Sequence, residues 1–131
     1  MNDASGARGV IVAHGTLAQG LTDAATIISG VEEGVLFPVS NAGRSPQALQ
    51  ESIDEHLAVG AVIVFTDLPS GSCAVAARKS CRGDGRKAVV CGVNLPMLLD
   101  FVFNRHLPFH ELVPRLLSKG IGSITSVPDY P

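Results

Sequence analysis

The sequence predicts a doubly wound α/β fold, in which a mostly parallel sheet lies between two layers of helices. Three observations favour it. Hydrophobic residues make up 46% of the 131 residues, aromatic residues only 5%, and Trp is absent, so the core is expected to be aliphatic. The apolar residues form short, nearly continuous runs rich in Val and Ile, as in parallel strands buried on both faces. Segments of helical length separate these runs, and the chain length fits a single domain over residues 1–131.

The expected strands coincide with the aliphatic runs. GVIVAH, GVLFPV, AVIVFT and KAVVCGV place strands at 9–14, 34–39, 61–66 and 87–93. A last run, GIGSITSV at 120–127, is strand-like but polar on one face, so we expect it at a sheet edge or paired with another chain. The small and polar residues 1–7 are expected to form a disordered tail.

The expected helices lie between the strands and after the fourth one, at 17–29, 46–59, 72–82, 94–105 and 108–120. Capping residues support their boundaries. Gly30 follows the first helix, in the position just beyond a helix end that glycine favours. Ser45 is a suitable N-cap for the second helix, with Pro46 in its first position. Pro114 lies inside the last helical segment and predicts a kink or a late start there.

A histidine and an aspartate end two of the strands. In open α/β sheets, functional groups gather beyond the carboxyl ends of the strands, where the strand order reverses. With a flavodoxin-like strand order, the first strand, which ends at His14, lies beside the third, which ends at Thr66 and Asp67. Because neighbouring strands are about 4.8 Å apart, the His14 and Asp67 side chains come within hydrogen-bonding reach. A carboxylate on one imidazole nitrogen fixes the tautomer and leaves the other nitrogen free as a nucleophile.

Small residues in tight turns surround this pair. Gly15 follows the histidine, and Ser70, Gly71 and Ser72 form the turn at the N-terminus of the third helix. Such turns direct backbone N–H groups outward, and a helix N-terminus favours an anion, which suggests transient phosphorylation of the ring. Each of these residues also fits an ordinary role, as a polar strand end, a turn or a helix cap. From the residues alone, both interpretations stay open.

Composition disfavours several classes of protein. The net charge is −2 and no basic run exceeds RGDGRK, which argues against nucleic acids and anionic membrane surfaces as partners. No apolar stretch approaches the roughly 20 residues of a membrane span. The first residues lack a signal-peptide pattern, and three cysteines without paired spacing are typical of reduced thiols. A cytoplasmic protein is therefore expected.

No metal or cofactor is expected. His106 and His110 are four residues apart, but Pro108 between them breaks the helical face that a metal-binding pair needs. Cys73 opens the third helix and is interpreted as a small residue packed near the site. GDGRK lacks the glycine spacing of a P-loop, so ATP binding has no support. A small-ligand-binding module without phosphoryl chemistry is the alternative from a different class, although the loops lack the aromatic residues expected around a flavin.

Three stretches resemble the IIA domain of the mannose-family phosphoenolpyruvate-dependent sugar phosphotransferase system. They are GVIVAHGTLAQGL at 9–21, VIVFTDLPSGS at 62–72 and VVCGVNLPMLL at 89–99. The resemblance extends from about residue 8 to residue 127, and GVNLPML at 92–98 is its most specific element. It implies a flavodoxin-like sheet and a homodimer in which the last strand, here 120–127, is exchanged between subunits.

The resemblance also implies a function. A IIA domain of this family accepts a phosphoryl group from the small carrier protein HPr and passes it to a IIB component, here expected as a separate polypeptide, in association with a membrane permease complex. His14 matches the phosphorylated histidine and Asp67 the aspartate that orients it. The phosphoryl group is expected to contact Gly15, Thr66, Gly71 and Ser72.

The chain departs from the family pattern in one loop. Where the family has GGSP after the aspartate, this chain has SGSC at 70–73, with Ser70 in place of the first glycine and Cys73 in place of the proline. Partner proteins are expected to dock on an apolar rim at the same edge of the sheet, formed by Leu68, Pro69, Asn94, Leu95, Pro96 and Met97.

Two alternatives share the histidine chemistry but not the acceptor. One is a IIA-like phosphoryl carrier that serves a dihydroxyacetone kinase. The other is a regulatory domain whose phosphorylation state modulates another protein. Both differ from a transport component in the proteins that they serve rather than in the residues at the site.

Overall fold

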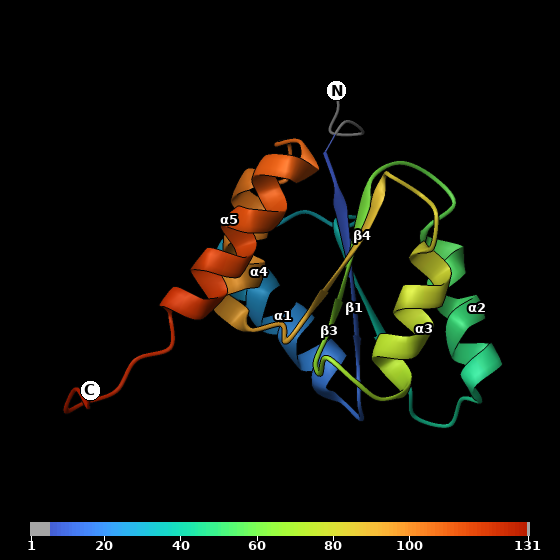
Figure 1. The fold of residues 1–131 in the computed structure, drawn as a ribbon, viewed down its shortest axis with the longest axis horizontal. Helices are drawn as coiled ribbons and strands as arrows, with labels where there is room; N and C mark the ends of the chain where they lie inside the picture. The colour runs from blue at the N-terminus through green and yellow to red at the C-terminus, as the bar shows by residue number, and fades with distance from the viewer. Residues whose placement is uncertain (1–5, 131) are drawn as a thin grey trace.

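A computed structural model describes residues 6–130 and contains one parallel sheet between two helical layers (Figure 1). The strands are β1 (Arg8–Ala13), β2 (Leu36–Ser40), β3 (Val62–Thr66) and β4 (Lys87–Cys91). The helices are α1 (Leu17–Ser29), α2 (Pro46–His56), α3 (Ser72–Cys81), α4 (Leu95–Asn104) and α5 (Phe109–Gly122). Across the described part of the chain, none of the helices combines the length and the apolar character needed to cross a bilayer.

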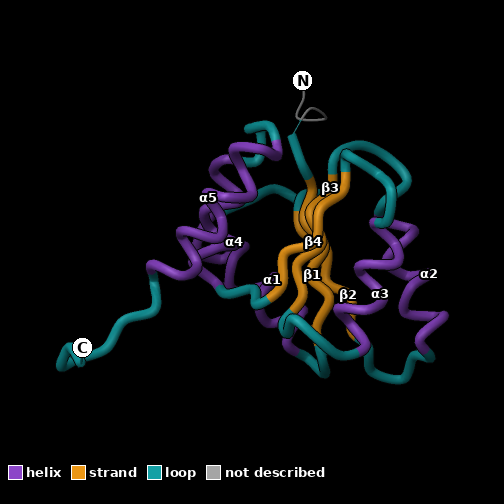
Figure 2. The backbone as a smooth tube through the Cα atoms, viewed as in Figure 1, coloured by secondary structure: helices purple, strands orange, loops and turns teal. Residues whose placement is uncertain are grey.

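The strand order is β2-β1-β3-β4, and every neighbouring pair is parallel. This confirms the doubly wound, flavodoxin-like order predicted from the sequence, with β1 between β2 and β3. Figure 2 shows α1, α4 and α5 on one face of the sheet and α2 and α3 on the other. The order of the strands reverses at β1, so the carboxyl ends of β1 and β3 form the edge at which this fold presents its functional groups.

The core consists of two aliphatic clusters, one on each face of the sheet. Ile11, Ile63 and Leu98 are fully buried on the face covered by α1, α4 and α5, where the rings of Phe65 and Phe101 also meet edge to face. Every residue of β3 is buried, as expected for a central strand covered on both faces. This rigid centre fixes the backbone from which the loops after β1 and β3 emerge.

The C-terminal strand expected at 120–127 is absent from the sheet within residues 6–130. Instead, α5 continues to Gly122, and the N–H of Ser123 donates to the carbonyl oxygen of Lys119, which closes the last turn. Gly120 is buried against α4, and its carbonyl oxygen accepts a hydrogen bond from the side chain of Asn94. These contacts hold residues 120–122 in the helix. Exchange of the exposed residues after α5 between two subunits stays a prediction.

The disordered tail expected at 1–7 is wrong for its last two residues. Residues 1–5 lie outside the described residues, but Gly6 and Ala7 are buried. The N–H of Ala7 donates to the carbonyl oxygen of Arg105, and the Arg105 guanidinium donates to that of Ala7. The late start that Pro114 could cause in the last helix is also not found, because α5 begins at Phe109 and runs through the proline.

Candidate functional site

His14 and Asp67 leave the sheet at the same edge. Val12 of β1 is the register partner of Thr66 of β3, so the residues that follow the two strands emerge side by side. His14 comes directly after β1 and Asp67 directly after β3. The parallel pairing therefore brings together two side chains that are 53 positions apart in the sequence, as the sequence predicted.

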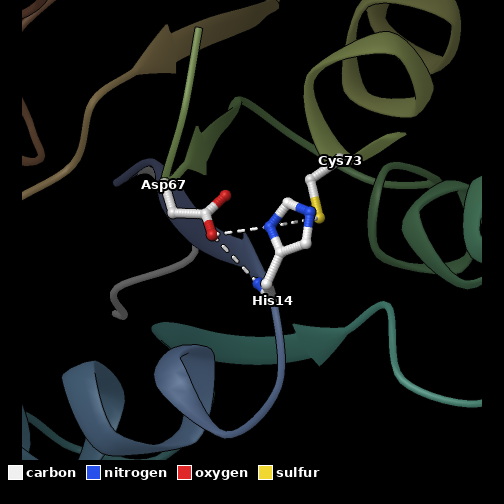
Figure 3. A group of neighbouring side chains, drawn as sticks. All are labelled: His14, Asp67 and Cys73. Carbon is white, nitrogen blue, oxygen red and sulfur yellow. Dashed lines mark hydrogen bonds and ion pairs between the residues drawn. The ribbon is translucent and has the colours of Figure 1, made fainter. Parts of the chain in front are cut away.

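One carboxylate oxygen of Asp67 holds the histidine at two points (Figure 3). Asp67 Oδ2 accepts a hydrogen bond from the backbone N–H of His14 at 3.0 Å and lies 2.8 Å from its ring Nδ1. The other oxygen, Oδ1, accepts from the N–H of Leu68 at 3.1 Å. A carboxylate facing Nδ1 favours the tautomer that carries its proton there, so Nε2 keeps a lone pair.

The environment keeps the Asp67 carboxylate ionised. Burial of the Asp67 carboxyl raises its pKa. The hydrogen bonds from the backbone and ring of His14, together with the charge of that ring when protonated, lower the pKa by more, so the net shift is downward. The Asp67 side chain is 10% exposed and that of His14 is 43% exposed. The site is thus an anchored, ionised carboxylate with a solvent-accessible imidazole in front of it.

Cys73, at the beginning of α3, lies against the imidazole. Its sulfur is buried, and Sγ lies 3.8 Å from Nδ1 of His14. Burial raises the pKa of the Cys73 thiol, and the nearby charge of Asp67 raises it further. The sequence identified Cys73 as a packing residue near the site. The structure adds that its thiol joins His14 and Asp67 in one cluster of metal-ligating atoms, all within 4.8 Å of one another.

The N-terminus of α3 offers backbone N–H groups beside this cluster. Gly71 is the N-cap of α3, with φ 95°, a left-handed conformation that glycine adopts without strain. It provides no side-chain cap, and the N–H of Val75 is the donor that reaches the Gly71 carbonyl oxygen. The N–H groups of the residues from Ser72 up to the one before Val75 are those that an α-helix leaves without an intrahelical acceptor. This end of the helix is suited to an anion.

Two of the other expected phosphoryl contacts are engaged within the protein. The N–H of Gly15 donates to Asn41 Oδ1 at 3.2 Å. Thr66 is fully buried, and its hydroxyl donates to the carbonyl oxygen of Leu68 at 2.8 Å. The placement of Thr66 at a phosphoryl group is therefore wrong; its hydroxyl instead secures the loop that begins with Asp67.

Ser40 and Asn41, which the sequence analysis did not identify, hold the turn after His14. The Ser40 hydroxyl donates to the carbonyl oxygen of Gly15 at 2.7 Å, while Asn41 Oδ1 accepts from the N–H of the same residue. Gly15 has φ 60°, a left-handed conformation that favours glycine, and these two hydrogen bonds hold the turn in place. The available signal was the pair Ser-Asn at the carboxyl end of β2, the other neighbour of β1.

The loop from β3 to α3 is braced by a residue that the sequence analysis also missed. Arg78, in the last turn of α3, donates from Nη2 to the carbonyl oxygen of Pro69 at 2.7 Å. This bond links the altered SGSC loop to the helix that it precedes. No sequence pattern around Arg78 indicates the contact, because it depends on the path of the loop.

The expected docking rim divides into exposed and internal residues. Leu68 is 51% exposed and Pro69 is also exposed, while Leu95 and Pro96 are half-buried. Met97 is 3% exposed and packs in the core, so its placement on the rim is wrong. Asn94 caps α4, because its Oδ1 accepts from the N–H of Met97, and its Nδ2 donates to Gly120 of α5.

Comparison with known proteins identifies related sequences and folds. The sequence model of a family described as "PTS system fructose IIA component", the mannose-type IIA family, matches residues 9–114. No curated protein matches the chain by sequence.

Several solved structures share the fold. The phosphotransferase system component EIIA from Streptococcus agalactiae superposes with a TM-score of 0.84 at 23% identity, over 92% of this chain and 97% of that one. The PTS IIA protein associated with the fucose utilization operon of Streptococcus pneumoniae gives 0.78 at 21% identity, over 93% of both chains. The mannose/sorbose specific IIA subunit from Enterococcus faecalis gives 0.81 at 19% identity, over 96% of this chain and 97% of that one.

Proposed function

Because this chain belongs to the mannose-type family of IIA components of the sugar phosphotransferase system, we propose that it carries a phosphoryl group on Nε2 of His14. The donor is the histidine-phosphorylated carrier HPr and the acceptor is a IIB component, both met in the cytoplasm, with IIB serving a membrane permease complex. The observation that carries this proposal is the contact of 2.8 Å between Asp67 Oδ2 and Nδ1, which leaves Nε2 as the nucleophilic nitrogen.

The transfer exchanges one nitrogen–phosphorus bond for another. The lone pair on Nε2 attacks phosphorus, the bond to the histidine of HPr breaks, and its electron pair returns to the HPr ring. His14 keeps its proton on Nδ1 and becomes cationic as the new bond forms. The Asp67 carboxylate, ionised and already in place, stabilises that charge without having to reorganise. Transfer to IIB is the same step in the opposite direction.

The transferring phosphoryl oxygens need hydrogen-bond donors. In this proposal the backbone N–H and the hydroxyl of Ser72, together with the turn at Gly71, supply them from the N-terminus of α3. Gly15 acts through its conformation, because its N–H is engaged by Asn41. Leu68 and Pro69, exposed beside the site, with the half-buried Leu95 and Pro96, form the apolar surface on which both partner proteins dock.

The test is phosphorylation from phosphoenolpyruvate through enzyme I and HPr, followed by the intact mass of the protein. The wild type gains the mass of one phosphoryl group, and His14→Ala does not. His110→Ala is the matched control, since the His110 side chain is 80% exposed and lies on α5, outside the site. Loss of the mass gain in both variants, or in neither, contradicts the assignment to His14.

The acceptor is tested separately. The phosphorylated protein, freed of HPr, is mixed with a IIB component or with the subunits of a dihydroxyacetone kinase, and loss of the phosphoryl group is followed over time. Rapid transfer to IIB supports a transport component. Transfer to the kinase subunits alone would identify the alternative carrier, and transfer to neither would favour a regulatory domain.

A further inference from the structure

We propose that His14, Asp67 and Cys73 form an inhibitory binding site for a thiophilic divalent cation, Zn²⁺ in the first instance. The three side chains supply one nitrogen, one oxygen and one sulfur atom, all within 4.8 Å of one another. Zn²⁺ binds all three kinds of ligand atom, and a site with three protein ligands keeps a fourth position open to water. The sequence predicted no metal because it offered only His106 and His110 as a pair; the cluster arises from the fold.

One distance between ligand atoms already suits a tetrahedral ion, and the other two, which lie within 4.8 Å, must change when the ion binds. With bonds of about 2.1 Å to nitrogen and about 2.3 Å to sulfur, a tetrahedral Zn²⁺ separates these two ligand atoms by about 3.6 Å. In the structure, Cys73 Sγ and His14 Nδ1 are 3.8 Å apart. Asp67 Oδ2 and Nδ1, now 2.8 Å apart across a hydrogen bond, must open to about 3.4 Å when the ion replaces the proton between them. The solvent-exposed ring of His14 has room to make this adjustment.

Each ligand has a different status before the ion binds. Asp67 is already an anion. Cys73 is a buried thiol that loses its proton to solvent when sulfur coordinates the ion, so one proton is released for each ion bound. His14 loses no proton overall, because coordination at Nδ1 moves the ring proton to Nε2. The two anions then balance the charge of the ion.

Movement of that proton makes metal binding and phosphorylation mutually exclusive. With Zn²⁺ on Nδ1, the lone pair of Nε2 is taken up by the proton, so this nitrogen no longer attacks phosphorus. With a phosphoryl group on Nε2, Nδ1 keeps its proton and has no lone pair for a metal. The inhibition rests on the proposed function, whereas the metal site itself does not. The departure from the family loop at Cys73, where a proline is usual, thus adds the sulfur ligand.

The metal site is tested with Co²⁺ as a spectroscopic substitute for Zn²⁺, on the unphosphorylated protein. We expect an intense thiolate-to-cobalt charge-transfer band that Zn²⁺ abolishes by displacement. Cys73→Ser should lose the band and bind Zn²⁺ at least about 10-fold more weakly. Cys91→Ser, which changes a cysteine that is more exposed, should keep both. Far-ultraviolet circular dichroism checks that each variant is folded, and Cys73→Ala provides a second loss of the ligand.

Three outcomes overturn the metal site: no thiolate band in the wild type, a band that survives both substitutions of Cys73, or equal Zn²⁺ affinity in the wild type and the folded Cys73 variants.

The inhibition is then tested by phosphorylation from HPr with one equivalent of Zn²⁺. The wild type should slow by at least about 10-fold, while Cys73→Ser should not. Equal slowing of both overturns the inhibition. A protein that shows the cobalt band but is never phosphorylated contradicts the proposed function and leaves the metal site supported.

Discussion

The backbone N–H and the ring Nδ1 of His14 both meet a single oxygen atom, Oδ2 of Asp67, at 3.0 and 2.8 Å. Because one contact comes from the main chain and the other from the side chain, the carboxylate fixes the rotation of the ring as well as the position of the turn. The geometry that a phosphoryl acceptor needs is thus present before any partner arrives. Two consequences of this arrangement can be measured.

Asp67→Asn removes the charge but keeps the size of the side chain. The amide can turn its nitrogen toward Nδ1 and favour the wrong tautomer, and it no longer stabilises a cationic ring. We expect phosphoryl acceptance to slow by on the order of 10² to 10⁴-fold, with the fold retained. Rapid-quench measurement of transfer from phosphorylated HPr checks the rate. A rate equal to that of the wild type would remove Asp67 from the mechanism.

The lowered pKa of Asp67 predicts a specific loss of stability in acid. Burial opposes the shift, but the hydrogen bonds and charge of His14 lower the pKa below its ordinary value of 3.8. At a pH between the folded and the unfolded pKa of Asp67, the unfolded chain binds more protons than the folded one. The contribution of Asp67 to the free energy of unfolding is therefore complete above the ordinary pKa and is lost as the pH falls through the lower folded pKa. The free energy of unfolding, measured with urea between about pH 6 and pH 3, should decline more steeply with falling pH for the wild type than for Asp67→Asn. Parallel curves would contradict the shift.

The His14–Asp67 pair was predictable because it depends only on strand order, which the pattern of buried runs indicates. The hydrogen bonds of Ser40 and Asn41 to Gly15 depend on the register of β2. The contact of Cys73 with His14 depends on the path of the loop before α3. Neither has a local pattern in the sequence. The run expected to form a strand from residue 120 instead continues α5 as far as Gly122, because the buried Gly120 packs against α4, a contact that depends on the tertiary fold; exchange of the residues after α5 stays a prediction.

The turn at Gly15 predicts a positioning role for Ser40 and Asn41. Ser40→Ala frees the carbonyl oxygen of Gly15, and Asn41→Ala frees its N–H. Since the turn is exposed, water replaces each partner, and stability should fall by only about 0.5–1.5 kcal/mol per variant. Phosphoryl acceptance should slow by roughly 10-fold in each variant and by more in the double variant, because a small displacement of the attacking Nε2 of His14 lowers the rate of transfer.

Gln47→Ala is a suitable control for these two variants, because Gln47 lies on the exposed surface of α2 and its amide donates to Glu51, one turn along the same helix. Its rate of phosphoryl acceptance should equal that of the wild type. If Ser40→Ala and Asn41→Ala also transfer at the wild-type rate, the hydrogen bonds to Gly15 serve the fold alone.

Asn94 provides a test of structural against docking roles within GVNLPML. Its Oδ1 caps α4 by accepting from the N–H of Met97, and its Nδ2 donates to the Gly120 carbonyl oxygen of α5. Asn94→Ala loses both bonds and should lower the free energy of unfolding by about 1–3 kcal/mol. Asn94→Ser keeps a capping oxygen and should lose less. Gly120→Ala leaves both Asn94 bonds in place and should change stability little, since its Cβ would lie 2.8 Å from Cε of Met97, the flexible end of a side chain that can shift, and alanine favours the helix. Chemical denaturation measures all three.

Because the Asn94 side chain is engaged between the two helices, phosphoryl acceptance by the folded variants should match the wild type. Unchanged stability with a raised KM for HPr would instead place Asn94 on the docking surface.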